Sequence, residues 1–255
     1  MASRPVFRAI ETAPYFKKEE TEFQFYSGFS VQQKQRSIQS LHASFRMLFP
    51  ESRILEISSK SPEAIGNRLS AFNLSVVMKS GKIYSVEQLF QSAKTFENGG
   101  PYTDILQKSP RDAKKDSRLF DSGRLVCFKL GELEFPLEPK TYFYNWLYVN
   151  ALAKDPELSK AILSYNAFTD IEFNPQRSIN CQAEAAAVYT GLCMAGKEKE
   201  ALKDKESFLK IVYQRNDEDN DDDNDGDNDD DNDNDDDDEV FQAVTYEQMS
   251  LTDLI

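Results

Sequence analysis

The chain has 255 residues, a formal net charge of −14 at pH 7, three cysteines and one histidine. No run of about 18 apolar residues occurs, which excludes an obvious membrane-spanning helix, and a single histidine makes Ser-His-Asp, Cys-His and multi-histidine metal sites hard to build. The cysteines are odd in number without metal-like spacing, and the N-terminus lacks the apolar core of a secretory signal. We therefore expect reduced thiols, no metal site and a cytoplasmic protein without a membrane partner.

The negative charge is concentrated in one stretch near the C-terminus. Residues 217–239 hold 17 Asp and Glu residues and no Lys or Arg, and residues 240–255 add two acidic residues. Removing these 19 from the 44 acidic residues leaves 25, against 30 basic residues, so the remainder carries a net charge of +5, which is compatible with phosphate-bearing partners. We predict a disordered acidic insertion at 214–239 and a short C-terminal segment at 240–255. The insertion is interpreted as a solvated loop, with a DNA mimic or a handle for a basic partner as alternatives.

The first quarter of the chain is only partly patterned. Residues 1–22 show weak patterning, so we expect a loosely packed N-terminal arm. The aromatic stretch 23–29 suggests a short strand and turn. Apolar residues then recur at helical spacing over 38–48, and Pro50 closes the run. His42 lies on or beside the apolar face, where a satisfied core or boundary histidine is favoured over a catalytic one because no partner is suitably spaced.

A helix with clear start and stop signals is predicted within residues 81–102. A hairpin over 74–84 leads into it. Ser85 and Gln88 form a capping box, in which the side chain of each residue accepts a hydrogen bond from the backbone N–H of the other. The sequence Asn-Gly-Gly-Pro at 98–101 should end the helix, because glycine permits left-handed dihedrals and proline stops continuation.

Two charged residues on this predicted helix are candidate catalytic residues. Glu87 and Lys94 lie seven residues apart, about two helical turns, so they project from one face with Gln91 between them. A carboxylate and an amine beside a glycine-rich loop suit a base and a nucleophile or electrophile. The alternative is that both are good helix formers on a solvated face.

A basic face is predicted in the next helix, which Ser109-Pro110 starts. Its members recur at i, i+3, i+4 and i+7 and are Arg111, Lys114, Lys115 and Arg118. Such a face suits contact with a pyrophosphate or a DNA backbone. It is equally compatible with a solvated face, since Asp112 and Asp116 are interleaved.

A second pair of acids lies in the stretch 167–175, where acidic and apolar residues alternate. Asp170 and Glu172 would point to one side of an extended segment. Paired carboxylates can divide acid and base roles when their environments push their pKa values apart. Capping of the following helix, or pairing with Arg177, are the alternatives.

The remaining patterns predict strands at 54–57, 125–128 and 132–135, and helices at 140–153, 156–165, 178–191 and 197–210. Trp146 is interpreted as a core anchor rather than a base-stacking surface. The fold class is therefore mainly α with small β-hairpin elements, an α+β single domain over residues 23–213.

The segment LSAFNLSVVMKSGKIYSVEQLFQSAK, residues 69–94, resembles the core of the NADAR (YbiA-like) family. That family carries an L-S-N-F segment, a short hairpin and a helix of the form S-x-E-x-x-[FY]-Q-x-x-K. Ala71 stands in place of the Asn, so a polar contact is missing or is supplied elsewhere, with Asn73 as the candidate. The blocks FENGGPY, SPRDAKKDSRL, PLEPKTYFYNWLY, AFTDIEFNP and SINCQAEAAA are similar to the subgroup of antitoxins encoded beside DarT-type DNA ADP-ribosyltransferases.

The resemblance implies a YbiA-like multihelical domain that removes ADP-ribose from guanine bases of DNA, by hydrolysis of an N-glycosidic bond, and acts as antitoxin to a DarT-type toxin. The implied partners are ADP-ribosylated DNA and the cognate toxin, and no cofactor is implied. Implied catalytic residues are Glu87 and Lys94, with Asp170 or Glu172 as second carboxylate. Residues implied to line the ADP-ribose pocket are Ser70, Asn73, Gln91, Asn98, Gly99 and Tyr102. Two alternatives stay open: a non-catalytic module that binds ADP-ribose or the toxin, and an N-glycosidase acting on riboflavin-pathway intermediates.

Overall fold

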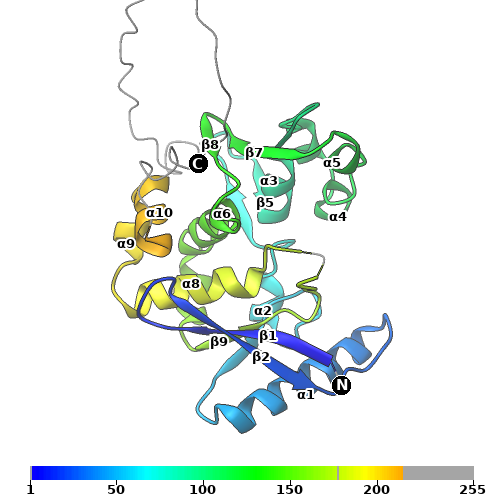
Figure 1. Ribbon diagram of the computed structural model, residues 1–255, viewed down its shortest axis with the longest axis vertical. Coiled ribbons are helices and arrows are strands. Elements are labelled where there is room, and N and C mark those ends of the chain that lie inside the picture. The colour runs from blue at the N-terminus through cyan, green and yellow to red at the C-terminus, as the bar shows by residue number, and fades with distance from the viewer. Residues whose placement is uncertain (1, 177, 215–255) are drawn as a thin grey trace, which may run out of the picture.

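The computed structural model describes residues 2–176 and 178–214 and combines a four-stranded sheet, two smaller sheets and a set of helices (Figure 1). The strands are β1 (Ala2–Ala9), β2 (Phe16–Phe23), β3 (Ile54–Glu56), β4 (Ser75–Val77), β5 (Ile83–Ser85), β6 (Lys94–Phe96), β7 (Leu125–Leu130), β8 (Leu133–Phe135) and β9 (Ala167–Thr169). The helices are α1 (Val31–Leu48), α2 (Ala64–Arg68), α3 (Val86–Ser92), a 3-10 turn η1 (Thr103–Gln107), α4 (Pro110–Ala113), α5 (Arg118–Asp121), α6 (Tyr142–Ala153), α7 (Pro156–Ile162), α8 (Gln182–Met194), α9 (Glu198–Ala201) and α10 (Lys205–Tyr213).

The largest sheet has the strand order β2-β1-β9-β3 and separates two hydrophobic clusters. Successive strand residues point to opposite faces. Val6 of β1 accordingly packs in the cluster with Leu41 and Phe45 of α1, whereas Phe7 belongs to the larger cluster that contains α6 and α8. Figure 1 shows α1 below this sheet and α8 above it. At Gly191 of α8, an added Cβ would lie 2.2 Å from the backbone oxygen of Tyr15, so only glycine allows this helix to approach the β1–β2 connection.

The expectation of a loosely packed arm over residues 1–22 is wrong. Strand β1 pairs antiparallel with β2 along its whole length and with β9 on its other side, and Val6 and Phe23 are fully buried. The reason for the error is that β2, FKKEETEF, is an edge strand with many charged side chains in water. Its stability comes from backbone pairing, which composition does not reveal. Residues 2–23 are therefore part of the folded domain.

The prediction of an α+β fold is confirmed, but the sheet content is larger than small hairpins. The parallel pairing of β3 with β9 joins segments more than one hundred residues apart, and three-residue strands give little periodicity to read. Helix α6 confirms the prediction for 140–153, and Trp146, 1% exposed, is a core residue that packs against Phe135.

Three further expectations meet the structure here. From residue 215 onwards, the predicted acidic insertion and the C-terminal segment lie outside the described residues. Within the described ranges, no helix is both long and apolar enough to cross a bilayer. The cysteines Cys127, Cys181 and Cys193 are free thiols.

His42 belongs to a buried polar network between α1 and the sheet. Its Nε2 lies 2.8 Å from the hydroxyl of Thr169, and that hydroxyl donates a hydrogen bond of 2.6 Å to Glu56. The hydroxyl has one proton, so the ring N–H must be the donor to it, which fixes a neutral imidazole protonated on Nε2. Burial, with a smaller contribution from Arg46, lowers the pKa of His42 to about 3. The histidine is thus a satisfied core residue, as the sequence favoured.

This burial predicts a specific loss of stability in acid. In the unfolded chain His42 titrates near its ordinary pKa of about 6.5, so the unfolded state binds more protons below that pH and the stabilising contribution falls as pH drops toward 3. We expect the free energy of unfolding of the wild type, relative to a His42→Gln variant, to fall by about 2 kcal/mol between pH 7 and pH 5. Urea denaturation at both pH values measures it. If the difference in unfolding free energy between the wild type and His42→Gln is the same at both pH values, His42 is not buried as a neutral imidazole.

Candidate functional site

Helix α3 begins as predicted but ends early. The Ser85 hydroxyl accepts a hydrogen bond from the backbone N–H of Gln88, and the Gln88 side chain accepts one from the N–H of Ser85, which completes the capping box. The helix ends at Ser92 rather than near 98, and Lys94 starts strand β6, which pairs antiparallel with β7. The expected alignment of Glu87 and Lys94 on one helix is therefore wrong. The loop after β6 is tight: at Gly100, φ is +88° and an added Cβ would lie 2.5 Å from the backbone oxygen of Lys94.

Glu87 is nonetheless an inward-facing carboxylate. It is 4% exposed, in the first turn of α3, and its Oε1 accepts a hydrogen bond of 2.9 Å from the Gln91 amide. Lys114 reaches the same oxygen at 3.6 Å, with its ammonium also 5.3 Å from the centre of the Phe72 ring. The positive end of the helix and the Lys114 ammonium both interact favourably with a negative charge at this position.

Lys94 lies close to this carboxylate although it is on a different element. Its side chain is half-buried, with Nζ 5.0 Å from the centre of the Phe90 ring. Burial lowers the pKa of Lys94 to about 8, against the opposing attraction of Glu87 and with a further lowering by Lys114. At pH 7 about a tenth of such an amine is neutral and able to act as a nucleophile.

Asp170 is tied to the same site through one backbone residue, Ala71. The carbonyl of Ala71 accepts a hydrogen bond of 2.9 Å from the N–H of Glu87. Its N–H donates 2.7 Å to the side chain of Gln182, whose amide nitrogen donates 2.9 Å to Oδ2 of Asp170. Ala71 thus makes these contacts with its backbone N–H and carbonyl rather than with its side chain. Through them it connects the two candidate carboxylates. The charges of both Glu87 and Asp170 also raise the pKa of the Tyr144 phenol, after the larger effect of burial.

The two acids of the 167–175 stretch do not share a face. Strand β9 ends at Thr169, and the next residues form a turn in which Oδ1 of Asp170 accepts hydrogen bonds from the N–H groups of Glu172 and Phe173. Asp170 is half-buried, whereas Glu172 is exposed and pairs with Lys34 at 2.8 Å. The alternation rule fails because the chain is not extended there. Asp170 remains the candidate second carboxylate, and Glu172 does not.

Two of the predicted ADP-ribose residues bring unused polar atoms to the site. The hydroxyl of Ser70 and Oε1 of Gln91 are buried without a hydrogen-bond partner. Buried polar atoms in this state are unusual and suit a site that closes around a polar ligand. Asn73 is different: it is exposed and donates to Asn67, so it does not replace the missing asparagine.

Asn73 lines a pocket of about 620 Å³ whose walls come from the β4–β5 hairpin and from the α6–α7 corner. Its lining includes Val77, Ile83, Lys154 and Pro156, but none of Glu87, Lys94 and Asp170. The pocket is therefore not the site around Glu87.

The loop with Asn98, Gly99 and Tyr102 makes its contacts away from Glu87. The Tyr102 hydroxyl lies 2.6 Å from that of Ser122, and the ring stacks on Phe96. An added Cβ at Gly99 would lie 2.2 Å from the Tyr102 hydroxyl oxygen, so glycine is required for this packing. Asn98 is exposed. The loop is therefore packed through Tyr102 against Ser122 and Phe96.

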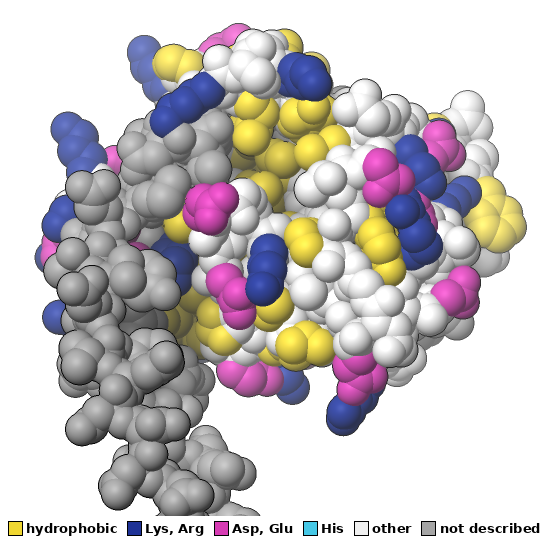
Figure 2. Space-filling model, turned by 90° about the horizontal axis from the view of Figure 1, so that it is seen from above, with side chains coloured by type: hydrophobic (Ala, Val, Ile, Leu, Met, Phe, Trp, Pro, Cys, Tyr) yellow, Lys and Arg dark blue, Asp and Glu magenta, His cyan; other side chains and the backbone are white. Residues whose placement is uncertain are grey.

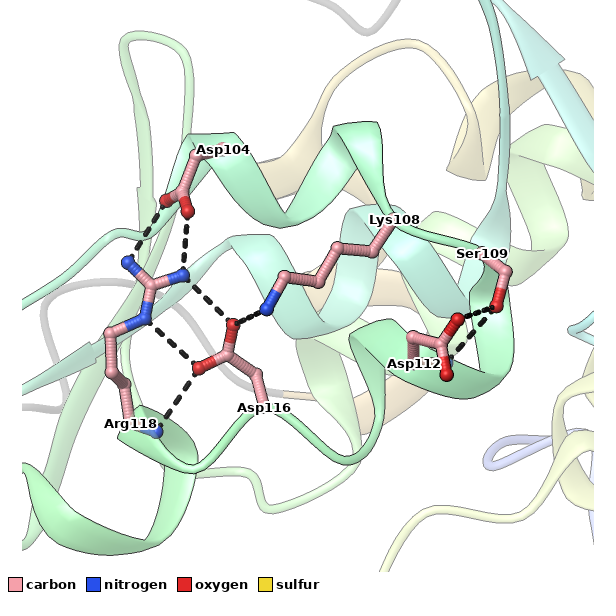
Figure 3. Close-up of polar contacts among 6 residues, drawn as sticks. All are labelled: Asp104, Lys108, Ser109, Asp112, Asp116 and Arg118. Carbon is pink, nitrogen blue, oxygen red and sulfur yellow. Dashed lines mark hydrogen bonds and ion pairs between the residues drawn. The ribbon is translucent and has the colours of Figure 1, made fainter.

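The predicted basic face does not form, because α4 ends at Ala113 and α5 begins at Arg118. Arg118 instead donates to Asp104 and to Asp116, which also accepts from Lys108 at 2.7 Å (Figure 3). The Arg118 hydrogen bonds hold the pKa of the buried Asp116 carboxyl well below its usual range. The charge of Arg118 is thereby neutralised, and only Lys114 of the four basic residues joins Glu87.

Arg111 and Lys115 are exposed. Figure 2 shows acidic and basic side chains interspersed on the face seen from above, rather than a continuous basic patch. A face with mixed charges attracts a DNA backbone less strongly than a continuous basic patch would.

Sequence reasoning missed three residues that organise the site: Tyr144, Gln182 and Glu56. Tyr144 is hidden in a uniformly apolar helix. Gln182 lies in the SINCQAEAAA block but carries no chemical signal by itself. Glu56 had a usable signal, since a lone acid in the apolar strand ILEI is costly to bury unless it is bonded.

Comparison with protein families decides the ancestry. The family model described as DarT1-associated NADAR antitoxin matches residues 2–222, most of the chain. The chain belongs to the DarT1-associated NADAR antitoxin family. The match starts at the first described strand, which agrees with the N-terminal hairpin being part of the NADAR fold unit. A search of curated proteins finds no significant match. Family membership points to an antitoxin role beside a DarT toxin.

The charges around Lys94 predict two opposite changes in its pKa. Because Glu87 raises this pKa and Lys114 lowers it, Glu87→Gln should lower the pKa of Lys94 below about 8, and Lys114→Gln should raise it. Titration of ¹³C-dimethylated lysines by NMR measures both, with the Lys94 signal assigned by its absence in Lys94→Arg. Shifts of the same sign in the two variants would refute this electrostatic arrangement.

Proposed function

We propose that this NADAR protein is a DNA ADP-ribosyl-guanine glycohydrolase, which reverses the modification made by its DarT-type toxin. The observation that carries the proposal is an interacting acid and amine: burial lowers the pKa of the half-buried Lys94 to about 8, and the charge of the buried Glu87 opposes that lowering. An amine with a lowered pKa is partly neutral at neutral pH and can attack the aldehyde carbon of a sugar. A solvent-exposed lysine is almost fully protonated at that pH and cannot.

The proposed reaction starts from the ring-opened form of the sugar, in which C1″ is joined to the guanine amine as an imine. The Lys94 amine forms a bond to C1″ and the bond from C1″ to the guanine nitrogen breaks. A carboxylic acid of the site gives its proton to the departing guanine amine. Water then adds to the new C1″ imine, which releases ADP-ribose and restores the Lys94 amine. Glu87 moves protons to and from the amine, and Asp170 is the candidate acid for the guanine nitrogen.

Measurement of turnover distinguishes a glycohydrolase from a protein that only binds ADP-ribose or modified DNA. The protein is incubated with a tenfold excess of guanine-ADP-ribosylated DNA, and free ADP-ribose is followed by chromatography. We expect product in excess over protein and unmodified guanine in the DNA. Protection of the DNA only up to one equivalent, with no free ADP-ribose, would mean that the protein sequesters its ligand and would overturn the enzymatic proposal.

A further inference from the structure

A buried carboxylate outside the proposed catalytic set, Glu56 of β3, holds the turn that carries Asp170. Its Oε2 accepts a hydrogen bond of 2.6 Å from the hydroxyl of Thr169, and its Oε1 accepts one of 2.9 Å from the N–H of Ile171. These are the two neighbours of Asp170 in the chain. A third donor, the hydroxyl of Ser58, reaches Oε1 at 2.7 Å.

We propose that Glu56 is a positioning residue for Asp170: it clamps the turn on both sides and places a second carboxyl beside that of Asp170. The inference rests on the proposed function, in which Asp170 serves as the acid. It deepens that function by saying how the acid is kept in place and in a protonated form.

The bonding around Glu56 favours its ionised form. All three polar neighbours donate to it, and the single proton of the Thr169 hydroxyl is used in that donation while the same oxygen accepts from His42. Hydrogen bonds donated to a carboxylate favour its charged form. Burial raises the pKa of Glu56, while the donors from Ile171, Thr169 and Ser58 oppose that rise.

A charged Glu56 disfavours a second charge at Asp170. Burial and then the charge of Glu56 raise the pKa of Asp170, and the hydrogen bonds from the N–H of Glu172 and the amide of Gln182 oppose the rise. The other titratable groups facing Asp170 are Glu172, itself paired with Lys34, and the buried Tyr144, Tyr148 and Cys181. Two carboxyls in one site divide their protons unequally, so one can serve as acid near neutral pH.

Glu56 is 1% exposed at the end of a short strand, where burial of a carboxylate costs stability that its hydrogen bonds must offset. Its matched control is Glu63, a carboxylate that accepts a hydrogen bond of 2.6 Å from Tyr165 but does not contact the Asp170 turn. Glu56→Gln keeps the shape and removes the charge. Glu63→Gln makes the same change elsewhere.

The first test needs no activity. ¹³C-carboxyl labelling of aspartate, with Asp170 assigned by Asp170→Asn, gives its pKa by NMR titration. We expect Glu56→Gln to lower the pKa of Asp170, and Glu63→Gln to leave it unchanged. An unchanged pKa in Glu56→Gln would overturn the inference. If the wild type releases no ADP-ribose, the proposed function fails but this titration still decides the role of Glu56.

The second test uses release of ADP-ribose from modified DNA. Because the acid must be protonated, activity should fall as pH rises through the pKa of Asp170, and Glu56→Gln should move that limb to lower pH. We also expect kcat to fall about tenfold with KM unchanged. A wild-type profile in Glu56→Gln would contradict the inference while leaving the glycohydrolase proposal intact.

A second substitution covers the case in which Glu56→Gln does not fold. Thr169→Val keeps the shape of the side chain but removes the hydroxyl between His42 and Glu56. It should lower kcat, and Thr169→Ser, which restores the hydroxyl, should recover it. Equal kcat in Thr169→Val and wild type at every pH would overturn the clamp.

Discussion

Replacement of Lys94 by alanine is expected to lower the rate of ADP-ribose release by roughly three orders of magnitude or more, as removal of a nucleophile does. The half-buried amine is the group proposed to bond to C1″, and neither the Glu87 carboxylate nor the Gln91 amide can form the imine in its place. Lys94→Arg should be equally inactive, because it keeps the charge but its guanidinium stays protonated at any usable pH. Release of ADP-ribose is measured at saturating DNA substrate.

The control for Lys94 is Lys129 of the neighbouring strand β7, which pairs at the surface with Glu134 at 2.9 Å. Lys129→Ala should keep wild-type activity. Equal thermal unfolding of Lys94→Ala and wild type would show that the loss is chemical. Retention of more than a tenth of the activity in a folded Lys94→Ala protein would remove the amine from the mechanism.

Replacement of Glu87 by glutamine is expected to reduce kcat about 100-fold or more, within the range for loss of a general acid or base. The side chain keeps its size and its contact with Gln91, so the fold should be preserved. What is lost is the carboxylate that exchanges protons with Lys94. Single-turnover kinetics with modified DNA measure the chemical step directly.

Glu134→Gln on β8 is the matched control, since Glu134 is exposed and its partner Lys129 lies outside the site. It should not change the rate. If Glu87→Gln and Glu134→Gln turned over equally fast, proton transfer would have to be assigned to another group, and Asp170 would be the next to vary.

Local signals in the sequence predicted parts of this site well. The capping box at Ser85 fixed the start of α3 and therefore the inward direction of Glu87. The end of the same helix could not be predicted, because α3 is cut short by pairing of β6 with β7, a contact with a segment about thirty residues away. Helical spacing predicted that Lys94 acts together with Glu87 because both lie on one helix. The two residues do interact, but Lys94 lies on strand β6.

Non-local contacts explain the other errors. The face of Arg111, Lys114, Lys115 and Arg118 fails because Arg118 finds Asp104 and Asp116 across a break between two short helices. The sheet was underestimated because β1, β3 and β9 come from three distant segments. The link from Ala71 through Gln182 to Asp170 likewise joins residues about one hundred positions apart, and a single sequence has no signal for it.

Reductive trapping tests the central claim most directly. The protein is mixed with guanine-ADP-ribosylated DNA in the presence of borohydride, which reduces an imine between lysine and sugar to a stable amine, and the modified peptide is identified by mass spectrometry. We predict one ADP-ribose adduct on Lys94, absent in Lys94→Arg. Full turnover with no adduct, or an adduct confined to Lys114, would contradict the account.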